Sequence, residues 1–358
     1  MKKFVSLFLF VLCCLTAGAT DIQRVDPPFW YAGMKNTELQ IMFYGENISD
    51  TPFSMDKYEG VTVKEVCKVE NPNYLFVYLD VSAKAEPGML QFQFGKGKKA
   101  VRHSFELRSR NQKEGAMGFT PQDVLYLIMP DRFANGNPDN DNLDGYIANR
   151  QGGGRHGGDI QGIMDHLDYI DDLGVTAVWL NPIQYNKGNS SHGYAISDYY
   201  LVEPRLGSNE EYCEMIDAAH ERGIKVVMDM IFNHSGSCHR WLEDRPSADW
   251  FNFPEGYEQT SYRLSTVYDP YVSDYDRRLT TEGWFVESMP DLNQNNEHLM
   301  TYLIQNSIWW IEASKIDGIR MDTHPYAFME PMARWIAAVE REYPRYNIVG
   351  ECWYANEG

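Results

Sequence analysis

Short apolar runs separated by turn residues dominate the first third of the chain. Three such runs, at residues 39–44, 61–63 and 74–79, are bounded by Gly, Pro and Asn. Residues 90–94 alternate strictly between apolar and polar before a glycine- and lysine-rich turn. Such alternation is typical of β-strands that bury one face. The pattern predicts a small all-β sandwich over residues 20–115.

The pattern of apolar residues changes near residue 116, and from there on strand-like and helix-like segments alternate. Continuous apolar runs, typical of buried parallel strands, occur at residues 124–129, 175–180, 224–232, 316–321 and 347–350. Apolar residues at helical spacing occur between them, at residues 160–173, 210–222, 297–314 and 328–342. The alternation predicts an α/β fold in which helices cover a parallel sheet.

The alternation of strands and helices is compatible with two folds that have a parallel sheet, an open doubly wound sheet and a (β/α)8 barrel. No glycine-rich phosphate-binding motif follows the first strand, so nucleotide binding gains no support. Polar residues gather at the carboxyl ends of the strands, as the active site of a barrel requires. We therefore expect residues 116–358 to form a partial TIM barrel with its first five strands. The stretch at 235–293 is too long for an ordinary loop and predicts an inserted subdomain.

The chain opens with the features of a secretory signal. Two lysines precede an apolar run at residues 4–15, and the small residues at 17–19 fit a cleavage site. The run is too short to span a bilayer, so residues 1–19 are predicted to be a cleaved signal peptide. We expect a periplasmic or extracellular protein with no membrane contact after cleavage. A lipoprotein anchor at Cys13 or Cys14 is an alternative, which the bulky residue before them disfavours.

Charge and composition narrow the class of partner. The formal net charge is −19, and a field of that sign repels nucleic acid and anionic membranes, so we expect no nucleic-acid partner. The aromatic share of 14 % suits a sugar-binding cleft and equally a large aromatic core. The four cysteines beyond the signal region match no zinc motif in their spacing, and both free thiols and a single disulfide are open.

Arg320 and Asp322 are the first candidates for chemistry. They lie two residues apart at the end of a predicted strand, so their side chains share one face. A guanidinium beside a carboxylate lowers the pKa of that carboxyl and keeps it ionised. An ionised, fixed carboxylate is what a glycosidase nucleophile needs, and a structural ion pair is the alternative.

Glu351 ends the fifth strand run and is a candidate acid. The neighbouring Cys352, Trp353 and Tyr354 predict a desolvated carboxyl with a raised pKa, able to donate a proton. A solvated glutamate at a strand end is the alternative. Together Asp322 and Glu351 suit a retaining glycosidase, in which the two carboxyls stand about 5–5.5 Å apart.

Asp229 lies inside the third apolar strand run. Burying its charge costs several kcal/mol unless it is paired, so a partner such as Arg320 is expected. Asn233 and His234 follow at the strand end, where they would present hydrogen-bonding groups at the rim. A lone histidine in this position is more often structural.

These residues fall into motifs that resemble glycoside hydrolase family 13, the α-amylase family. Residues 229–234 have the form D-x-x-x-N-H, residues 318–322 have the form G-x-R-x-D, and Glu351 follows at the spacing of the family's acid. The sequence Met-Pro-Asp-Leu-Asn at 289–293 resembles a segment of the neopullulanase and cyclomaltodextrinase branch, and residues 192–200 resemble the segment after the second barrel strand. Five motifs in the family's order, over nearly the whole mature chain, make the resemblance specific.

The resemblance implies a role for each matching residue. It implies Asp322 as the nucleophile, Glu351 as the acid/base and Arg320 as the partner of the nucleophile. It also implies His192 and His234 as hydrogen-bond donors to the reacting sugar and Tyr194 as a ring that stacks on that sugar. Asp229 and Asn233 are implied as supports of these groups.

One motif of the family does not occur before Gly358. It is a His-Asp pair after a later strand, which supplies a third catalytic carboxylate, and strands six to eight would accompany it. The sequence thus predicts a C-terminally truncated member. Because five strands cannot close an eight-stranded barrel, we expect residues 20–358 alone to be neither a stable barrel nor an active hydrolase. A soluble, cooperatively melting and starch-cleaving preparation of residues 20–358 would contradict this expectation.

A segment rich in Asn and Asp follows the first barrel strand. Hard oxygen ligands suit Ca²⁺, although the spacing is not that of an EF-hand. The segment resembles the calcium loop of neopullulanase-type enzymes, so we expect one bound Ca²⁺, with an Asn/Asp-rich turn as the alternative. The expected ligands are Asn135, Asn137, Asn140, Asp141, Gly157 through its carbonyl, and Asp159.

The sequence therefore predicts an exported, retaining, endo-type hydrolase of α-1,4-glucosidic bonds in starch, maltodextrins, cyclodextrins or pullulan. Its partner is expected to be an α-glucan oligo- or polysaccharide. A non-catalytic glucan-binding protein on an amylase scaffold is the alternative, and α-1,6 hydrolysis and transglycosylation stay open. The resemblance extends to the opening of the neopullulanase N-terminal domain at residues 29–34 and allows a homodimer of the full-length enzyme.

Overall fold

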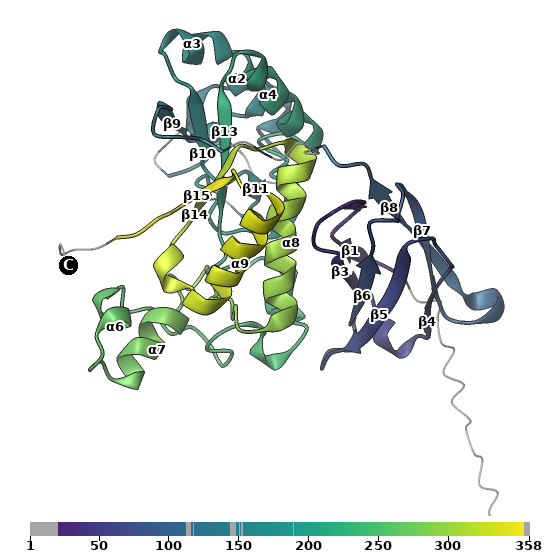
Figure 1. Ribbon diagram of the computed structural model, residues 1–358. Coiled ribbons are helices and arrows are strands. Elements are labelled where there is room, and N and C mark those ends of the chain that lie inside the picture. Colours follow the sequence, from purple (N-terminus) through teal and green to yellow (C-terminus); the bar gives the residue numbers. More distant parts are fainter. Residues whose placement is uncertain are drawn as a thin grey trace, which may run out of the picture.

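A computed structural model describes residues 21–111, 116, 118–143, 148, 149, 151, 153–188 and 190–353. The predicted signal peptide lies outside the described residues. A β-sandwich lies beside a larger α/β unit, and helix α8 (Glu297–Ser314) runs along the boundary between them (Figure 1).

The sandwich consists of two four-stranded sheets within the described residues. One sheet is antiparallel, in the order β1 (Arg24–Asp26), β3 (Glu38–Tyr44), β6 (Tyr74–Val81) and β5 (Val61–Lys68). The other has the order β2 (Trp30–Tyr31), β8 (Val101–Arg108), β7 (Gly88–Phe94) and β4 (Phe53–Met55), with β2 parallel to β8. Phe43 of β3 packs on Phe92 and Phe94 of β7 at ring-centroid distances of 5.4 and 5.0 Å, which joins the two sheets into one core.

The predicted strands of the sandwich are confirmed as parts of β3, β5, β6 and β7, but four strands were not predicted. Strands β1, β2 and β4 have only two or three residues, which is too short to show a period. Strand β8 buries only Phe105 and Leu107, near its end, so its first half carries no apolar alternation.

A five-stranded parallel sheet forms the centre of the α/β unit. Its order is β15 (Asn347–Gly350), β14 (Gly318–Met321), β13 (Lys225–Met230), β10 (Ala177–Leu180) and β9 (Leu125–Ile128). Each apolar run predicted as a barrel strand is one of these strands, and the chain order equals the spatial order, as in a partial α/β barrel. The two edges are β9 and β15, where Leu125, Leu127 and Val349 are exposed.

Helices follow the strands and cover the sheet. The described helices of the α/β unit, besides α8, are α1 (Pro130–Phe133), η3 (Pro138–Asn140), α2 (Ile160–Met164), α3 (Leu167–Asp172), α4 (Asn209–Glu221), α5 (Arg240–Glu243), η4 (Ala248–Trp250), α6 (Ser265–Tyr268), α7 (Asp274–Glu282), η5 (His324–Tyr326) and α9 (Met329–Glu342). The helix predicted at 160–173 is divided into α2 and α3, because His166 leaves the helical conformation with φ −116° and ψ 15°. Helices α4, α8 and α9 match their predictions closely.

Residues 235–293 interrupt the strand–helix alternation between β13 and β14. An isolated bridge between His234 and Asp291 brings the two ends of this segment together, and a second bridge joins Phe251, inside the segment, to Leu292. Helices α6 and α7 form a pair that stands apart from the parallel sheet (Figure 1). The segment is therefore anchored beside the end of β13, next to the carboxyl edge of the sheet.

Partly buried ion pairs tie the sandwich to the α/β unit. Arg24 of β1 binds Asp26 and also Asp198 of the strand β12 (Asp198–Val202), which pairs with β11 (Gln184–Tyr185). Arg240 of α5 binds the other oxygen of the Asp26 carboxylate, with 2.8 Å between Arg240 Nη2 and Asp26 Oδ2. Because buried charges require partners, this network fixes how the sandwich lies against the segment after β10.

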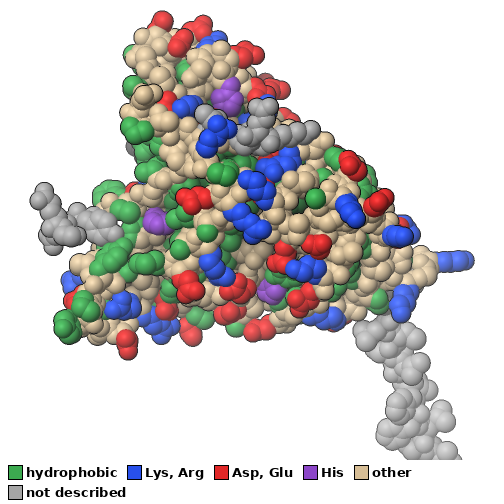
Figure 2. All heavy atoms as spheres, viewed as in Figure 1, with side chains coloured by type: hydrophobic (Ala, Val, Ile, Leu, Met, Phe, Trp, Pro, Cys, Tyr) green, Lys and Arg blue, Asp and Glu red, His purple; other side chains and the backbone are tan. Residues whose placement is uncertain are grey.

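The visible surface mixes charges of both signs. Figure 2 shows Lys and Arg side chains interspersed with Asp and Glu on this face. Within the described ranges, no helix combines the length and the hydropathy needed to cross a membrane.

Candidate active site

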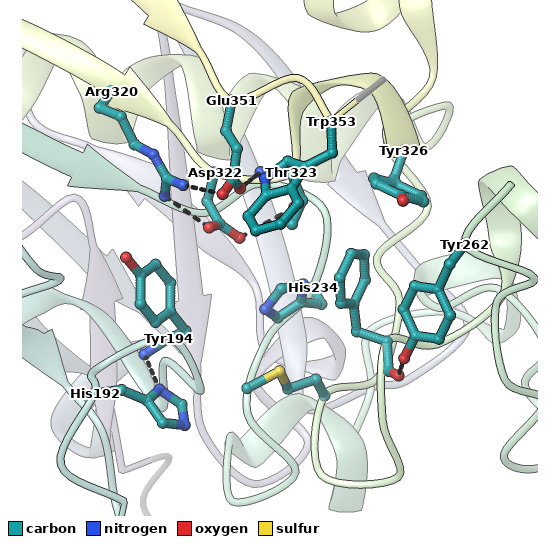
Figure 3. Close-up of a pocket in the computed structure, with 12 residues that line it drawn as sticks. His192, Tyr194, His234, Tyr262, Arg320, Asp322, Thr323, Tyr326, Glu351 and Trp353 are labelled. Carbon is teal, nitrogen blue, oxygen red and sulfur yellow. Dashed lines mark hydrogen bonds and ion pairs between the residues drawn. The ribbon is translucent and has the colours of Figure 1, made fainter. Parts of the chain in front are cut away.

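A cavity of about 770 Å³ opens where β13, β14 and β15 end. Parallel strands present their carboxyl ends at one edge, so residues far apart in sequence meet there. The lining combines charged groups with aromatic rings (Figure 3) and consists of His192, Tyr194, His234, Tyr262, Phe285, Met289, Arg320, Asp322, Thr323, Tyr326, Glu351 and Trp353.

Arg320 is the centre of the charged group. It lies beside Asp229 in the register of β14 on β13, and its Nη1 is 2.8 Å from Asp229 Oδ1 and 2.7 Å from Asp322 Oδ1. The predicted pairing of Asp229 with Arg320 is confirmed. Trp179 Nε1 and Tyr194 Oη also donate to Asp229 Oδ2, at 3.0 and 3.1 Å. Asp229 is thus held by three neighbours, and its carboxylate in turn fixes the position of the Arg320 guanidinium.

Two aromatic rings flank the guanidinium. The Arg320 Cζ atom is 5.1 Å from the ring centroid of Trp179 and 5.7 Å from that of Tyr194, within cation–π range. Burial lowers the pKa of Arg320, but the carboxylates of Asp229 and Asp322 outweigh it and raise that pKa above its usual value. Arg320 is therefore a permanent, fixed cation.

Glu351 reaches the same guanidinium from the end of β15. Its Oε1 is 2.6 Å from Arg320 Nη2, and its Oε2 accepts the backbone N–H of Thr323 at 2.9 Å. Figure 3 shows the Asp322 and Glu351 side chains pointing toward each other beside Arg320. One guanidinium thus binds three carboxylates.

The protonation order differs from the sequence prediction. Burial, reinforced by neighbouring carboxylates, raises the pKa of Asp322 to about 7. Burial acts on Glu351 as well, but the Thr323 N–H, the Trp353 indole and Arg320 outweigh it and lower the pKa of Glu351 below its usual value. The prediction of a low pKa for Asp322 and a raised one for Glu351 was therefore wrong. Its physical reason is that three carboxylates share one guanidinium, while Glu351 is only partly buried.

Asp322 and Glu351 are held by a common partner. Both carboxyls bind the same guanidinium, through Nη1 and Nη2 of Arg320, and this common partner draws them together.

Two histidines lie in the cavity wall opposite the carboxyls. Burial lowers the pKa of His234 to about 4, so its ring is neutral, and its Nε2 has no hydrogen-bond partner within the described part of the chain. The Nδ1 of His192 accepts the backbone N–H of Tyr194 at 3.0 Å. Asn233 does not line the cavity; its Nδ2 donates to Asp291 Oδ1 at 2.9 Å, behind His234. The structure thus brings His192, Tyr194 and His234 together and places Asn233 as a support.

Several lining residues were not predicted. Phe285 packs on Tyr262 and Tyr326 at ring-centroid distances of 5.3 and 4.9 Å and on His234 at 5.6 Å, so these rings form one aromatic wall. Tyr262 and Phe285 belong to the 235–293 segment, whose irregular loops carry no periodic signal. Their position at the cavity follows only from the folding of that segment beside β13.

Two known protein families match this chain. The family described as the α-amylase catalytic domain matches residues 127–354, which is more than half of the chain. The chain belongs to the α-amylase family of glycoside hydrolases. The family described as the cyclomaltodextrinase N-terminal domain matches residues 24–111, which form the sandwich.

Relatives in the α-amylase family support the same assignment. A maltogenic α-amylase of Bacillus acidopullulyticus is 34 % identical over 248 residues, covering 64 % of this chain and 38 % of the relative. A cyclomaltodextrinase of Geobacillus thermopakistaniensis is 33 % identical over 250 residues, with coverage of 64 % and 38 %. The crystal structure of an Anoxybacillus α-amylase superposes with a TM-score of 0.57 at 34 % identity, covering 65 % of this chain and 47 % of that one. The matched part spans less than half the length of each of these relatives.

The Asn- and Asp-rich loop of this α-amylase-family chain folds back on the start of α2. Asn135 Nδ2 donates to Asp141 Oδ1 at 2.8 Å, and Gly157, at φ +89°, leaves no room for a Cβ beside the same oxygen. The Oδ1 atoms of Asn135 and Asn140 are buried and have no hydrogen-bond partner in the described ranges. The fold therefore brings Asn135, Asp141 and Gly157 together.

Asp159 and Asn137 of the same loop have other partners. The Asp159 carboxylate caps α2 through Gly162 N–H at 2.7 Å and accepts the N–H groups of Gly136 and Asn137 at 3.0 and 2.8 Å. The side chain of Asn137 caps η3. These two side chains hold the loop in shape.

The raised pKa of Asp322 predicts how stability depends on pH. An unfolded Asp has a pKa of about 3.9, and burial raises the pKa of folded Asp322 to about 7. Between these values the folded state keeps a proton that the unfolded state loses, so the free energy of unfolding falls as pH rises. Asp322→Asn removes this group and should melt at least about 3 °C above the wild type at pH 8.

Thermal melts from pH 4 to pH 8 check this expectation. The gain of Asp322→Asn should be small at pH 4, where the folded carboxyl is protonated and the unfolded one is about half protonated. Asp168→Asn is the control, because the Asp168 side chain is 87 % exposed. A melting-temperature difference that is the same at both ends of the pH range would contradict the expectation.

Proposed function

We propose that this chain carries the nucleophile and the acid of a retaining hydrolase of α-1,4-glucosidic bonds. The substrates would be starch, maltodextrins, cyclodextrins or pullulan. The observation that carries the proposal is the pair of carboxyls, Asp322 and Glu351, bound to one guanidinium at the floor of an aromatic-lined cavity. Membership of the α-amylase family and the names of its relatives support the substrate class.

The reaction has two displacements. Asp322 attacks the anomeric carbon and forms a glycosyl ester, while Glu351 gives its proton to the departing glycosidic oxygen. Glu351 then removes a proton from water, which attacks the ester and releases the sugar with Asp322 restored. Each step moves one proton to or from Glu351, and the configuration at the anomeric carbon is inverted twice.

The shared proton of the carboxyl pair explains how the resting site reaches the reactive state. Burial raises the pKa of Asp322 to about 7, so at neutral pH this carboxyl is protonated in about half of the molecules. A sugar ring against Glu351 would exclude water from that carboxyl and raise its pKa. The proton then belongs on Glu351, and Asp322 becomes the ionised nucleophile beside Arg320.

The remaining predicted residues fit the binding of a sugar. The neutral His234 offers its free Nε2 to a hydroxyl, and His192 lies in the same wall. Tyr194 presents a ring held in place by its hydrogen bond to Asp229. Asn233 and Asp229 support these groups from below.

The test is release of reducing ends from amylose by the protein expressed from its complete gene. Wild-type protein should release them and Asp322→Asn should not. Cellulose-derived oligosaccharides, which have β-linkages, are the substrate control. A wild-type protein that binds amylose yet releases no reducing ends would establish the alternative, a non-catalytic glucan-binding protein.

We also propose that the Asn- and Asp-rich loop binds one Ca²⁺. The buried, unpaired oxygens of Asn135 and Asn140, the Asp141 carboxylate and the Gly157 carbonyl would be the ligands, and Ca²⁺ accepts such oxygen sets. Among the described residues, no group of three or more His, Cys, Asp or Glu is placed to hold a metal ion, so amide and carbonyl oxygens would supply most of the ligands. The ion would hold the loop beside the start of α2.

Removal of calcium is expected to lower the melting temperature, because an ion bound only by the folded state adds its binding free energy to stability, about 2.7 kcal/mol at a hundredfold excess over Kd. Asp141→Ala should abolish the response to chelator. Asp159→Ala should lower the melting temperature with and without chelator, since Asp159 caps α2. A wild-type melting temperature that chelator leaves unchanged would favour a metal-free turn.

Export is proposed on the sequence of residues 1–19 alone. An alkaline-phosphatase fusion to residues 1–25, active only outside the cytoplasm, would test it.

A further inference from the structure

Thr323 lies between the two carboxyls in an unusual backbone conformation. It follows Asp322 directly, and its φ of 46° and ψ of 33° are in the left-handed region. A β-branched residue rarely adopts this region, so the surrounding contacts must hold it there. Residues held in such conformations cluster at functional sites.

Two donors of Thr323 reach the two carboxyls. Its backbone N–H donates to Glu351 Oε2 at 2.9 Å, and its Oγ1 donates to Asp322 Oδ2 at 3.1 Å. Thr323 is only 8 % exposed and lines the cavity (Figure 3). Arg320 also contacts both carboxyls, Asp322 through Nη1 and Glu351 through Nη2.

Gly350 makes this arrangement possible. A Cβ at Gly350 would lie 3.1 Å from the Cβ and Cγ atoms of His324, which is tighter than ordinary packing. Glycine at this place lets η5 lie against the end of β15. The Thr323 N–H is thereby brought to Glu351, the residue after Gly350.

We propose that Thr323 is a positioning residue that sets the orientation and the charge of both carboxyls during the reaction. When Glu351 gives up its proton, the Thr323 N–H stabilises the carboxylate that forms, and such help in the transition state raises kcat. The Thr323 hydroxyl holds Asp322 Oδ2, so that Oδ1 stays on Arg320 and the carboxylate plane is fixed. This inference rests on the proposed function of the two carboxyls.

Matched variants separate the hydroxyl from the fold. Thr323→Ser keeps the hydroxyl and the N–H, and Thr323→Val keeps the shape but lacks the hydroxyl. Thr323→Gly also lacks the hydroxyl but suits the left-handed backbone, so it serves if the valine variant folds poorly. Each variant leaves the N–H in place.

The hydroxyl-free variants should lose about tenfold to a hundredfold in kcat, with KM changed less than about threefold, because Thr323 acts on the carboxyls rather than on the sugar. The acid limb of kcat/KM should move to higher pH, since the ionised Asp322 loses a donor. Thr323→Ser should stay within about threefold of wild type. If Thr323 mattered only for folding, kcat/KM would fall by the same factor at every pH, and its acid limb would stay at the same pH.

The carboxyl pKa values give a second readout that needs no turnover. ¹³C NMR titration of Asp322 should show a higher pKa in Thr323→Val and Thr323→Gly than in wild type and Thr323→Ser. If wild-type protein cleaved no α-glucan, the proposed function would fail while this titration still decided the positioning role. Unchanged titration and pH profiles in both hydroxyl-free variants, or an equal loss in Thr323→Ser, would overturn the inference.

Discussion

Arg320→Met is expected to lower the free energy of unfolding by about 3–5 kcal/mol at pH 8, because it leaves buried carboxylates without their cation. Arg320 binds Asp229, Asp322 and Glu351 at 2.6 to 2.8 Å, and Asp229 is almost fully buried. At pH 5 the loss should be smaller. Burial raises the pKa of Asp229 to about 6 in the wild type already, and without Arg320 the buried carboxyls would bind protons more tightly still.

Urea unfolding at pH 5 and pH 8 measures this effect. The matched control is Arg334→Met, which removes the exposed ion pair with Glu297. An exposed pair contributes about 0–1 kcal/mol. An Arg320→Met protein no less stable than Arg334→Met at pH 8 would show that the carboxyls do not depend on the guanidinium.

Glu351→Gln is expected to slow cleavage of maltooligosaccharides by about 10²–10⁴-fold, the usual contribution of a general acid. The same variant should release fluoride from α-maltosyl fluoride in a rapid burst of one equivalent, because fluoride leaves without a proton. Turnover should then stop at the glycosyl ester, since no base activates water. Asp322→Asn should lose both reactions by about 10⁴-fold, because no nucleophile remains.

The two substrates distinguish an acid from a structural residue. A burst from Glu351→Gln together with lost maltooligosaccharide cleavage assigns the acid role. Equal loss on both substrates would indicate that Glu351 matters for the shape of the site instead. Retained activity of Asp322→Asn on either substrate would remove Asp322 as the nucleophile.

The parallel sheet and the charged residues it carries were predictable from the sequence. Buried parallel strands are continuous apolar runs, so β13 and β14 could be predicted. Asp229 was recognised as a charged residue inside such a run. Its pairing with Arg320 followed from the cost of an unpaired buried charge. The short strands β1, β2 and β4 were not visible, because two or three residues show no period.

The electrostatics of the site could not be predicted from neighbours in the sequence. The order of the pKa values of Asp322 and Glu351 depends on the ion pairs that three carboxylates form with one guanidinium and on the hydrogen bond from the Thr323 N–H. These contacts arise only when three strand ends come together. Likewise, the aromatic wall of Tyr262, Phe285 and Tyr326 joins an irregular segment to the turn after β14. Such contacts between distant segments leave no pattern in either one.

The anomeric configuration of the first product tests the central claim most directly. Two displacements at one carbon, the first by Asp322, preserve the α configuration. ¹H NMR during early cleavage of maltoheptaose by the protein expressed from its complete gene should therefore show the α-anomer first, followed by slow mutarotation. Initial appearance of the β-anomer would contradict the account, because it would require a single displacement by water and leave Asp322 no role as a nucleophile.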